Sequence, residues 1–336
     1  MVAVRRLYLV TGAAGHLGNT VVRMLAEKGE KVRLLVLPGE KHIEAVSALS
    51  EIFTGDVRDK VSMRTFFQTD DDVQKIVIHC AGIVSIASKF EQRVYDVNVS
   101  GTKNIVELCK EYGVHKLVYV SSVHAIPELS PGQVITETDC FAPDLVKGLY
   151  AKTKAEATAF VLQAAEQGLN VSVVHPSGIC GPYDTGRGHL TQLFIDYYKG
   201  RLTAGLRGGY DFVDVRDVAA GVIACCERGQ RGECYILSNR YVSIPELLEM
   251  FHEVSGRKRV RTILPLWFVR LTAPLAELYY KLLRQPPLYT AYSIYTLTSN
   301  AYFSHEKAER DLGYAVRPLT ETVRDTMCWL KEQGRI

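Results

Sequence analysis

The feature that most constrains the fold of this chain is a regular alternation of short apolar runs and helical patterns through its first half. The apolar runs have the length of buried strands, and several of the helical patterns between them end at a glycine. This order predicts right-handed βαβ units around a parallel sheet. Strands are expected at 7–10, 32–37, 51–54, 75–80, 116–121, 171–175 and 235–237, with a helix running through 23–28 and further helices at 93–112 and 149–167.

After about residue 180 the alternation weakens, and helical patterns follow at 244–254, 267–283, 305–312 and 319–333. At roughly 150 residues per domain, a chain of 336 residues can form two units. The fold class expected is α/β, a doubly wound parallel sheet with a smaller, mostly helical C-terminal lobe. We assign residues 1–180 to the sheet domain, with 211–240 returning to the sheet, and residues 181–210 and 241–336 to the second lobe.

Composition and charge exclude several classes of protein. The net charge of +3 is too small to indicate nucleic-acid binding. The eight cysteines include no C-x-x-C pair, and no group of residues has metal-ligand spacing, so we expect reduced thiols, no metal and a cytoplasmic setting. The apolar run after Arg5 and Arg6 is too short for a signal peptide. Charged residues and prolines interrupt the segment 263–283, which predicts no membrane span, although contact with a membrane surface stays open.

A glycine-rich turn follows the first predicted strand and opens the first helix, with the sequence Thr11-Gly12-Ala-Ala-Gly15-His-Leu-Gly18. Gly12 permits a tight turn, Gly15 lets the backbone approach a pyrophosphate, and Gly18 lets the helix pack closely on the sheet. The N–H groups at the start of the helix favour an anion. This strand–turn–helix context predicts that the sheet domain is a dinucleotide-binding Rossmann fold and that the second lobe binds the substrate.

Tyr150 and Lys154 are spaced i, i+4 and share one face of the predicted helix 149–167. A phenol has a pKa of about 10, too high for a base near neutrality, but a cation within about 4–6 Å can lower that pKa by roughly 1 to 3. The pair therefore predicts a tyrosine that donates or accepts a proton and a lysine that also reaches ribose hydroxyls. A chance Tyr-x-x-x-Lys on a surface helix is the alternative.

The G-x-x-G-x-x-G spacing, with further motifs in matching order, resembles the extended branch of the short-chain dehydrogenase/reductase superfamily, the NAD-dependent epimerase/dehydratase family. These motifs are Asp56-Val57, His79-Cys-Ala-Gly82, Asn98 in Asn-Val-Ser-Gly-Thr, Ser121-Ser122, Tyr150-Ala-Lys-Thr-Lys154, His175-Pro176-Ser-Gly-Ile-Cys-Gly181-Pro182 and Phe212-Val-Asp-Val-Arg-Asp-Val218. The resemblance covers nearly the whole chain and implies an NAD(P)-dependent oxidoreductase with catalytic Ser122, Tyr150 and Lys154. It implies that the cofactor is bound by Gly12, Gly15, His16, Leu17, Gly18, Asp56, Val57, Ala81, Gly82, Asn98, Ser121, Tyr150, Lys154, Pro176 and Ile179.

The choice between Ser121 and Ser122 follows from strand geometry and from the resemblance. Successive side chains of a strand face opposite sides, so only one of the two can meet Tyr150. Alignment with the family's strand selects Ser122, which would hydrogen-bond the substrate oxygen as charge develops.

The end of the second predicted strand leaves the choice between NAD and NADP open. An acidic residue there would bind the ribose 2′-hydroxyl of NAD, and an arginine would bind the phosphate of NADP. These positions hold Val36 and Leu37, while Glu40 and Lys41 lie just beyond with opposite charges. Because the acidic residue is missing and Lys41 is close, we slightly favour NADP.

Three departures from the family pattern argue against nucleotide-sugar substrates, whose diphosphate needs charged partners. The usual Asn is replaced in Ser177-Gly178-Ile-Cys-Gly-Pro, the usual Arg is Tyr210, and Val-His-Ala follows Ser122 in place of the dehydratases' Thr-Asp-Glu segment. What remains resembles the dihydroflavonol-reductase and 3β-hydroxysteroid-dehydrogenase groups, which bind bulky apolar substrates under the C-terminal lobe. The residues expected to contact such a substrate are Val84, His124, Ser177, Tyr210 and Trp267.

The function expected is hydride transfer between a nicotinamide and a hydrophobic secondary alcohol or ketone, hydroxysteroid-like or dihydroflavonol-like. A nucleotide-sugar epimerase or dehydratase is one alternative, and a non-catalytic dinucleotide-sensing regulator is another, which the intact Tyr150 and Lys154 disfavour. His79 and His175 lie within strands and are expected to be structural. The class also allows a homodimer, without indicating one.

Overall fold

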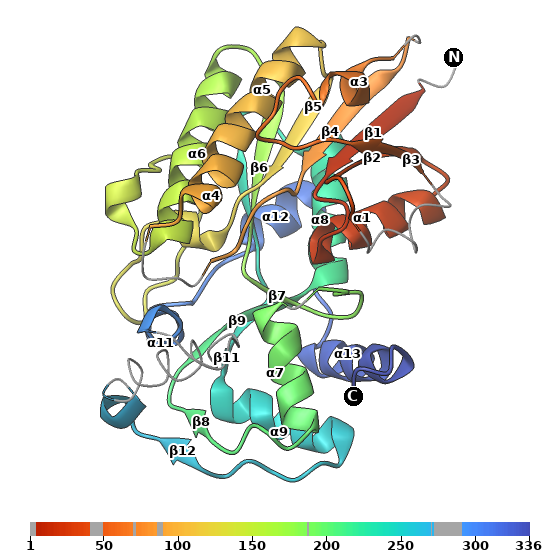
Figure 1. Ribbon diagram of the computed structural model, residues 1–336. Coiled ribbons are helices and arrows are strands. Elements are labelled where there is room, and N and C mark those ends of the chain that lie inside the picture. Colours follow the sequence, from red (N-terminus) through yellow and green to blue (C-terminus); the bar gives the residue numbers. More distant parts are fainter. Residues whose placement is uncertain are drawn as a thin grey trace.

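The computed structural model describes residues 5–40, 50–69, 72–85, 90–186, 188–269, 271 and 291–336. Within these ranges, seven strands form one parallel sheet in the order β10-β6-β5-β4-β1-β2-β3 (Figure 1). The strands are β1 (Arg6–Thr11), β2 (Lys31–Val36), β3 (Glu51–Thr54), β4 (Gln74–His79), β5 (Lys116–Val120), β6 (Val171–Pro176) and β10 (Cys234–Leu237). The expected doubly wound α/β class is confirmed, and each strand matches a predicted apolar run.

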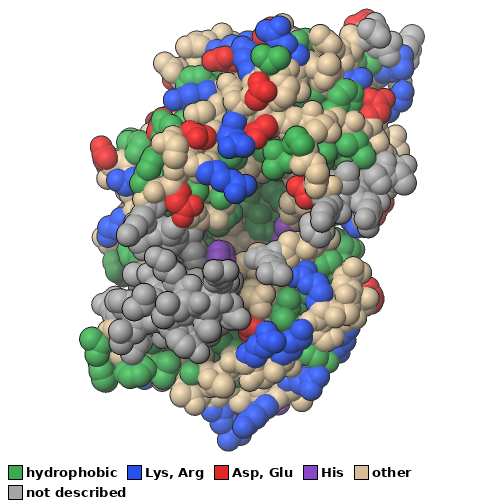
Figure 2. Space-filling view, viewed as in Figure 1, with side chains coloured by type: hydrophobic (Ala, Val, Ile, Leu, Met, Phe, Trp, Pro, Cys, Tyr) green, Lys and Arg blue, Asp and Glu red, His purple; other side chains and the backbone are tan. Residues whose placement is uncertain are grey.

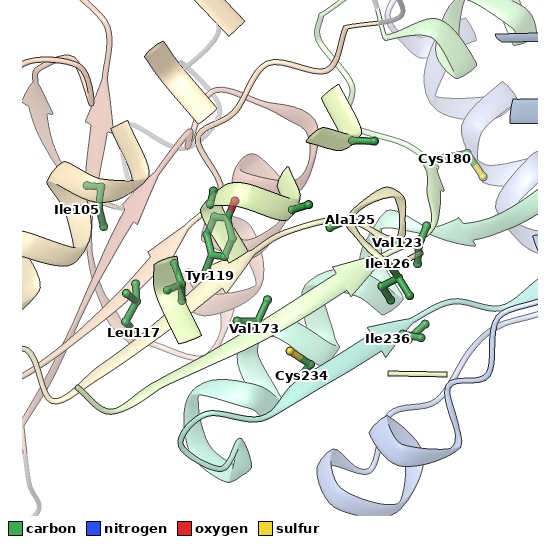
Figure 3. Close-up of a cluster of buried hydrophobic side chains, with 14 of the residues drawn as sticks. Ile105, Leu117, Tyr119, Val123, Ala125, Ile126, Val173, Cys180, Cys234 and Ile236 are labelled. Atoms are coloured by element: carbon green, nitrogen blue, oxygen red, sulfur yellow. The ribbon is translucent and has the colours of Figure 1, made fainter. Parts of the chain in front are cut away.

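Both faces of the sheet are covered around its central strands, which explains why the buried positions of these strands are mostly apolar, whereas the edge strand β3 is largely exposed. Leu7 and Leu9 face one hydrophobic cluster, whereas Tyr8 and Val10 face the other. Figure 3 shows part of the first cluster, where side chains of β5, β6 and β10 pack together. The helices of this domain are α1 (His16–Glu27), α3 (Arg64–Phe67), α4 (Gln92–Tyr95), α5 (Gly101–Glu111), α6 (Leu149–Glu166), α8 (Val215–Arg228) and α12 (Glu306–Leu312).

The helices divide between the two faces as a doubly wound sheet requires. α5 and α6 lie together on one face, and α1, α8 and α12 lie together on the other (Figure 1). The predicted single helix 93–112 is wrong in one respect, because a π-helical segment, Asp96–Ser100, separates α4 from α5. This wider turn carries Asn98, whose buried amide hydrogen-bonds the backbone of Ile83. Single π-helical turns are frequent at functional sites.

The second lobe contains more β-structure than the expected mostly helical arrangement. β7 (Gly178–Cys180), β9 (Gly209–Asp214) and β11 (Arg240–Ser243) form a three-stranded sheet, and β8 (Gly205–Leu206) pairs with β12 (Ile263–Leu264). Of the residues 211–240 expected to return to the large sheet, β10 joins that sheet and α8 packs on it, whereas β9 stays in the small sheet. The helices here are α7 (His189–Tyr198), α9 (Ile244–Ser255), α11 (Ala291–Thr298) and α13 (Leu319–Glu332).

Most of the predicted helix 267–283 lies outside the described residues. No helix in the part of the chain that is described is long and apolar enough to cross a bilayer.

The order of the large sheet reverses between β1 and β4, and in open parallel sheets ligands bind at the carboxyl ends of the strands beside such a point. The ends of β1, β4, β5 and β6 therefore define where the functional site should be sought.

Candidate active site

The glycine turn between β1 and α1 has the backbone geometry that its sequence predicts. Gly12 adopts a positive φ of 67°, and a Cβ there would lie 2.7 Å from the backbone nitrogen of Ala81. A Cβ at Gly18 would lie 2.2 Å from the carbonyl oxygen of Gly12, so α1 packs directly on the turn. Gly15 occupies the N-cap of α1 and has no side chain with which to cap it. The start of the helix can therefore present its N–H groups to an anion.

The chain after β4 is held close to this turn by Asn98. The Asn98 Oδ1 atom accepts a hydrogen bond from the Ile83 N–H at 2.8 Å, and its Nδ2 donates to the Ile83 carbonyl at 3.0 Å and to Thr153 at 3.1 Å. A Cβ at Gly82 would lie 3.4 Å from the Lys154 ammonium nitrogen. Residues 81–83 therefore form a narrow backbone wall between the glycine turn and α6.

Tyr150 and Lys154 both lie on the buried face of α6, with 8% and 4% of their surfaces exposed. The Lys154 Nζ donates to the Val120 carbonyl at 2.8 Å and lies 5.0 Å from the centre of the Tyr119 ring. Burial lowers the pKa of Lys154 to about 8. The surface-helix alternative for this pair is therefore wrong.

The pKa of Tyr150 moves in the direction opposite to the one the sequence predicts. Burial raises this pKa to about 12, and a hydrogen bond with Ser122 offsets only part of the rise. The expected lowering fails because Lys154 is directed at the Val120 carbonyl while Tyr150 is deeply desolvated. Tyr150 is consequently a neutral phenol near pH 7, which suits a proton donor.

The two serines at the end of β5 have different partners. The Ser122 Oγ accepts a hydrogen bond from the His124 N–H at 3.2 Å and also hydrogen-bonds Tyr150. The Ser121 Oγ lies 2.7 Å from the Thr158 hydroxyl and is buried. Only Ser122 is thus placed beside Tyr150, in agreement with the alignment. The assignment of Ser121 to the cofactor stays a prediction.

His124 lies between Tyr150 and the second lobe. Its ring centre is 5.9 Å from that of Tyr150 in an edge-on arrangement, and its Nε2 lies 3.1 Å from the Tyr210 hydroxyl. Tyr292 of α11 completes this aromatic group, with its ring centre 6.3 Å from that of His124. Burial lowers the pKa of His124 to about 4 and raises that of Tyr210 well above 10, so both are neutral near pH 7.

The other predicted histidines are buried within the sheet. His79 binds the Thr11 hydroxyl at 2.7 Å through Nδ1 and the Thr102 hydroxyl at 3.1 Å through Nε2, and burial lowers its pKa to about 3. His175 binds the Ser122 carbonyl at 3.0 Å and stacks on Phe141. These contacts confirm structural roles for His79 and His175.

The predicted adenine side of the site is polar. The Asp56 carboxylate forms an ion pair with Arg58 at 2.6 Å, which lowers the pKa of Asp56. Val57 is buried against Gly101, where a Cβ would lie 2.7 Å from the valine side chain. At the end of β2, Val36 is buried and Leu37 is exposed, and Lys41 lies outside the described residues.

Several residues that the sequence assigned to the cofactor or substrate have other contacts than the group around Tyr150. His16 binds the Pro182 carbonyl at 2.8 Å, Leu17 is buried, and Pro176 and Ile179 lie on β6 and β7. The Ser177 hydroxyl binds the Asp211 carboxylate at 2.5 Å.

The side chains of Val84 and Trp267 are exposed, at 62% and 68%, and the Trp267 ring packs on Phe268. The structure thus brings His124 and Tyr210 to Tyr150 but gives Val84 and Trp267 no contact with that group.

Two residues of the site lie outside the motifs. Tyr292 packs so closely that a Cβ at Gly148, which has a positive φ of 91°, would lie 2.2 Å from its ring. Asp211 is buried beside Ser177, and burial raises its pKa to about 6. Tyr292 is one of several tyrosines between residues 279 and 295 of the sequence, none of which a motif singles out, and no pattern indicates Asp211.

The surface is hollowed where these elements meet. Figure 2 shows a hollow near the middle of this face, with hydrophobic side chains in its depth and a histidine at its rim. Among the described residues, no three His, Cys, Asp or Glu side chains gather as metal ligands would. The polar groups beside Tyr150 are therefore hydroxyls, an imidazole and one ammonium group.

Comparison with known proteins agrees with this geometry. The profile of the NAD dependent epimerase/dehydratase family matches residues 8–238. The sterol demethylase protein B of Methylococcus capsulatus is 31% identical over 333 residues, which cover 98% of this chain and 99% of that protein. A 3-beta-hydroxysteroid dehydrogenase of Mycolicibacterium neoaurum is 30% identical, with 91% and 86% covered. The crystal structure of gox2253 superposes with a TM-score of 0.84 at 30% identity, over 98% and 99% of the two chains.

The profile spans the glycine turn, the Tyr150–Lys154 pair and the last strand of the large sheet. Its match covers more than two thirds of the 336 residues. The chain is therefore an enzyme of the NAD-dependent epimerase/dehydratase family, the extended branch of the short-chain dehydrogenases/reductases.

Proposed function

We propose that this protein transfers a hydride between a nicotinamide cofactor and a hydrophobic secondary alcohol or ketone, hydroxysteroid-like or dihydroflavonol-like. The observation that carries the proposal is the surroundings of Tyr150. A buried neutral phenol bonds Ser122 on one side and borders His124 on the other, with Tyr210 and Tyr292 beyond the imidazole. This wall is aromatic and uncharged, which suits an apolar substrate better than a diphosphate.

The residues present fit a dinucleotide. The backbone packs so closely at Gly12 and Gly18 that neither position has room for a side chain, whereas a Cβ at Gly15, the N-cap of α1, would meet only the Gly12 carbonyl oxygen at 3.2 Å. The side of the turn at Gly15 is therefore where a pyrophosphate can approach the start of α1. We assign the pyrophosphate to this turn, the adenine to Asp56 and Val57, and the ribose next to the nicotinamide to Lys154 and the backbone at Ala81 and Gly82. The bound nicotinamide supplies or accepts the hydride.

The chain's own groups handle the proton. In the reductive direction, Ser122 donates a hydrogen bond to the substrate carbonyl and holds its carbon toward the cofactor. Tyr150 gives its phenolic proton to the oxygen as the hydride reaches the carbon, and the product is the alcohol. The resulting phenolate is reprotonated from solvent, and Lys154 contributes through the ribose next to the nicotinamide. Oxidation of the alcohol is the reverse sequence.

For the cofactor we favour NADP. The end of β2 presents the buried Val36 and the exposed Leu37, so no carboxylate there would repel a 2′-phosphate. We expect kcat/KM to be higher with NADPH than with NADH. A clear preference for NADH would contradict this choice without affecting the role of Tyr150.

The epimerase alternative is less well supported. Tyr210 stands where nucleotide-sugar enzymes of this family use an arginine, and its hydroxyl is bound to His124 rather than directed toward an anion. A non-catalytic sensor would have no need for the buried Tyr150–Lys154 pair. Any activity with UDP-sugars that exceeded activity with ketones would favour the epimerase.

The direct test is Tyr150→Phe in a screen of steroid, flavanonol and simple ketones with both nicotinamides. The variant keeps the aromatic ring and loses the proton, so turnover should fall by about 10²-fold or more while cofactor affinity changes little. Tyr302→Phe, an exposed tyrosine, is the matched control and should keep full turnover. If Tyr150→Phe keeps more than about half of the turnover, the acid–base assignment is wrong.

A further inference from the structure

Two segments of the second lobe, 198–207 and 256–264, form a strongly basic edge. They contain no acidic residue and seven cationic ones, all exposed, which are Lys199, Arg201, Arg207, Arg257, Lys258, Arg259 and Arg261. Figure 2 shows Lys and Arg side chains gathered at the lower end of the molecule, where Figure 1 places β8 and β12. Because the whole chain has a net charge of only +3, the rest of the chain is net negative, and the positive charge is concentrated at this edge.

The two segments of the basic edge are held side by side, although they are far apart in the sequence. The Gly205 N–H donates to the Thr262 carbonyl at 2.9 Å, where β8 pairs with β12. At the end of α7, the Tyr197 hydroxyl donates to the Lys258 carbonyl at 3.3 Å. The cations of both segments therefore act on the same partner.

Most of this charge is not neutralised within the chain. Arg201 pairs with Asp196 at 3.6 Å, and Arg259 pairs with Glu249. In the part of the chain that the structure describes, the other five cations of the basic edge form no ion pair. The edge thus presents an excess of positive charge to an anionic partner.

Exposed apolar side chains follow the basic edge directly after β12. Residues 266–269 and 271 are helical, and Trp267 and Leu271 lie one turn apart, each 68% exposed. Val269 lies on the other side, where it is buried and packs with Ile294 of α11. This contact anchors the turn and leaves Trp267 and Leu271 directed outward. Large apolar groups exposed beside polar ones mark interaction sites.

We propose that the basic edge, together with Trp267 and Leu271, binds the surface of an anionic lipid bilayer. Clusters of about 4–8 Lys or Arg are attracted to phosphate headgroups, and indole rings favour the boundary between headgroups and acyl chains. A nucleic acid would use the same cations, but it has no acyl layer to receive Leu271. The proposal is independent of the function proposed above, because lipid binding is measured without cofactor or substrate.

The test of the charges is sedimentation of the full chain with vesicles. One kind contains phosphatidylcholine and phosphatidylglycerol in equal amounts, and the other contains phosphatidylcholine alone. The double variant Lys258→Gln/Arg261→Gln removes two cations of the basic edge, and Lys28→Gln/Lys31→Gln, at exposed positions of the sheet domain, is the matched control. Since each cation near an anionic surface contributes about 5-fold to binding, the first should weaken binding by about 10-fold or more and the control by less than about 3-fold.

The test of the apolar contact uses the two tryptophans of the chain. Trp267→Ala should weaken binding to the anionic vesicles by about 5-fold or more, and Phe90→Ala, an exposed aromatic residue of the sheet domain, by less than about 2-fold. Trp329→Phe leaves Trp267 as the only tryptophan. Its fluorescence emission should shift to shorter wavelength when anionic vesicles are added, because the indole leaves water.

Binding that needs phosphatidylglycerol, weakens with added salt and falls in both test variants but in neither control upholds the proposal. It is overturned if the wild type stays in the supernatant, if it binds both kinds of vesicle alike, or if either test variant binds like the wild type. Binding of single-stranded RNA, equal in the wild type and Trp267→Ala and without vesicle binding, would make the edge a nucleic-acid site instead. The salt titration and the emission shift leave the basic edge unaltered, so they decide the matter even if a charge variant does not fold.

Discussion

Replacing Lys154 with Met should make the folded protein more stable while removing its chemistry. Lys154 is 4% exposed, and burial lowers its pKa from the ordinary 10.5 to about 8. Because one pKa unit corresponds to about 1.36 kcal/mol, this lowering of the pKa amounts to about 3 kcal/mol of free energy. This is the free energy that the folded state loses at neutral pH by keeping an ammonium group in its core.

The pH window follows from proton binding. Since the unfolded chain holds the Lys154 proton more tightly, the cost is fully present below about pH 8 and disappears as the pH rises toward 10.5. Met has a similar length without the charge, but it deprives the Val120 carbonyl of the donor that binds it at 2.8 Å. Losing a buried partner costs about 1–3 kcal/mol, so we expect a net gain of about 1 kcal/mol near pH 7.

The assay is urea unfolding of the ligand-free wild type and Lys154→Met at about pH 7 and about pH 9.5. The wild type should recover about 2 kcal/mol relative to the variant at the higher pH, because its lysine then loses the proton on folding. Turnover of the variant should fall by at least about 10²-fold. Lys152→Met, exposed on the same helix, is the control and should alter stability by less than about 0.5 kcal/mol at both pH values.

Two outcomes would refute this reasoning. A difference between the wild type and Lys154→Met that is the same at both pH values would mean that burial does not lower the pKa of Lys154. A loss of more than about 1 kcal/mol by the variant near pH 7 would mean that the hydrogen bond to Val120 outweighs the cost of desolvation.

Gly15→Val should abolish nicotinamide binding, because the branched side chain stands where the pyrophosphate approaches the backbone. The fold should stay intact, because a Cβ at Gly15 meets only the Gly12 carbonyl oxygen, at 3.2 Å. Normal binding in a fluorescence titration would falsify the turn assignment. Gly18→Ala places a Cβ 2.2 Å from that same oxygen and should lower Tm as well, which thermal melting would detect. Asp211→Asn should stabilise the protein more at about pH 8 than at about pH 4. Burial raises the pKa of Asp211 from 3.8 to about 6, so the free-energy cost of ionising this carboxyl in the folded state is fully present only above about pH 6. Equal gains in the free energy of unfolding, measured with urea at the two pH values, would contradict this. With NADP present, a steroid ketone should raise Tm and UDP-glucose should not, and the reverse result would favour the epimerase alternative.

The sequence alone determined those features that depend on a short stretch of chain. The seven strands of the large sheet were predicted within a few residues. A strand covered on both faces carries a run of apolar residues, and only the edge strand β3, which is largely exposed, had a weak pattern. The glycine turn was predicted for a similar reason, since a positive φ at Gly12 and the packing at Gly18 tolerate no side chain. The i, i+4 spacing likewise placed Tyr150 and Lys154 on one helix face.

Tertiary structure decided everything that depends on how deeply a group is buried and on which distant segment covers it. His124 and Tyr210 are 86 positions apart, and no local pattern predicts that the imidazole and the phenol meet. The pKa of Tyr150 rises where helix spacing alone suggested a fall, because desolvation depends on every element packed around the ring, whereas spacing describes only one neighbour. A cavity beside α11 likewise exists only where the segments 123–135, 145–151 and 295–303 come together, so its shape follows from long-range packing that local patterns do not encode.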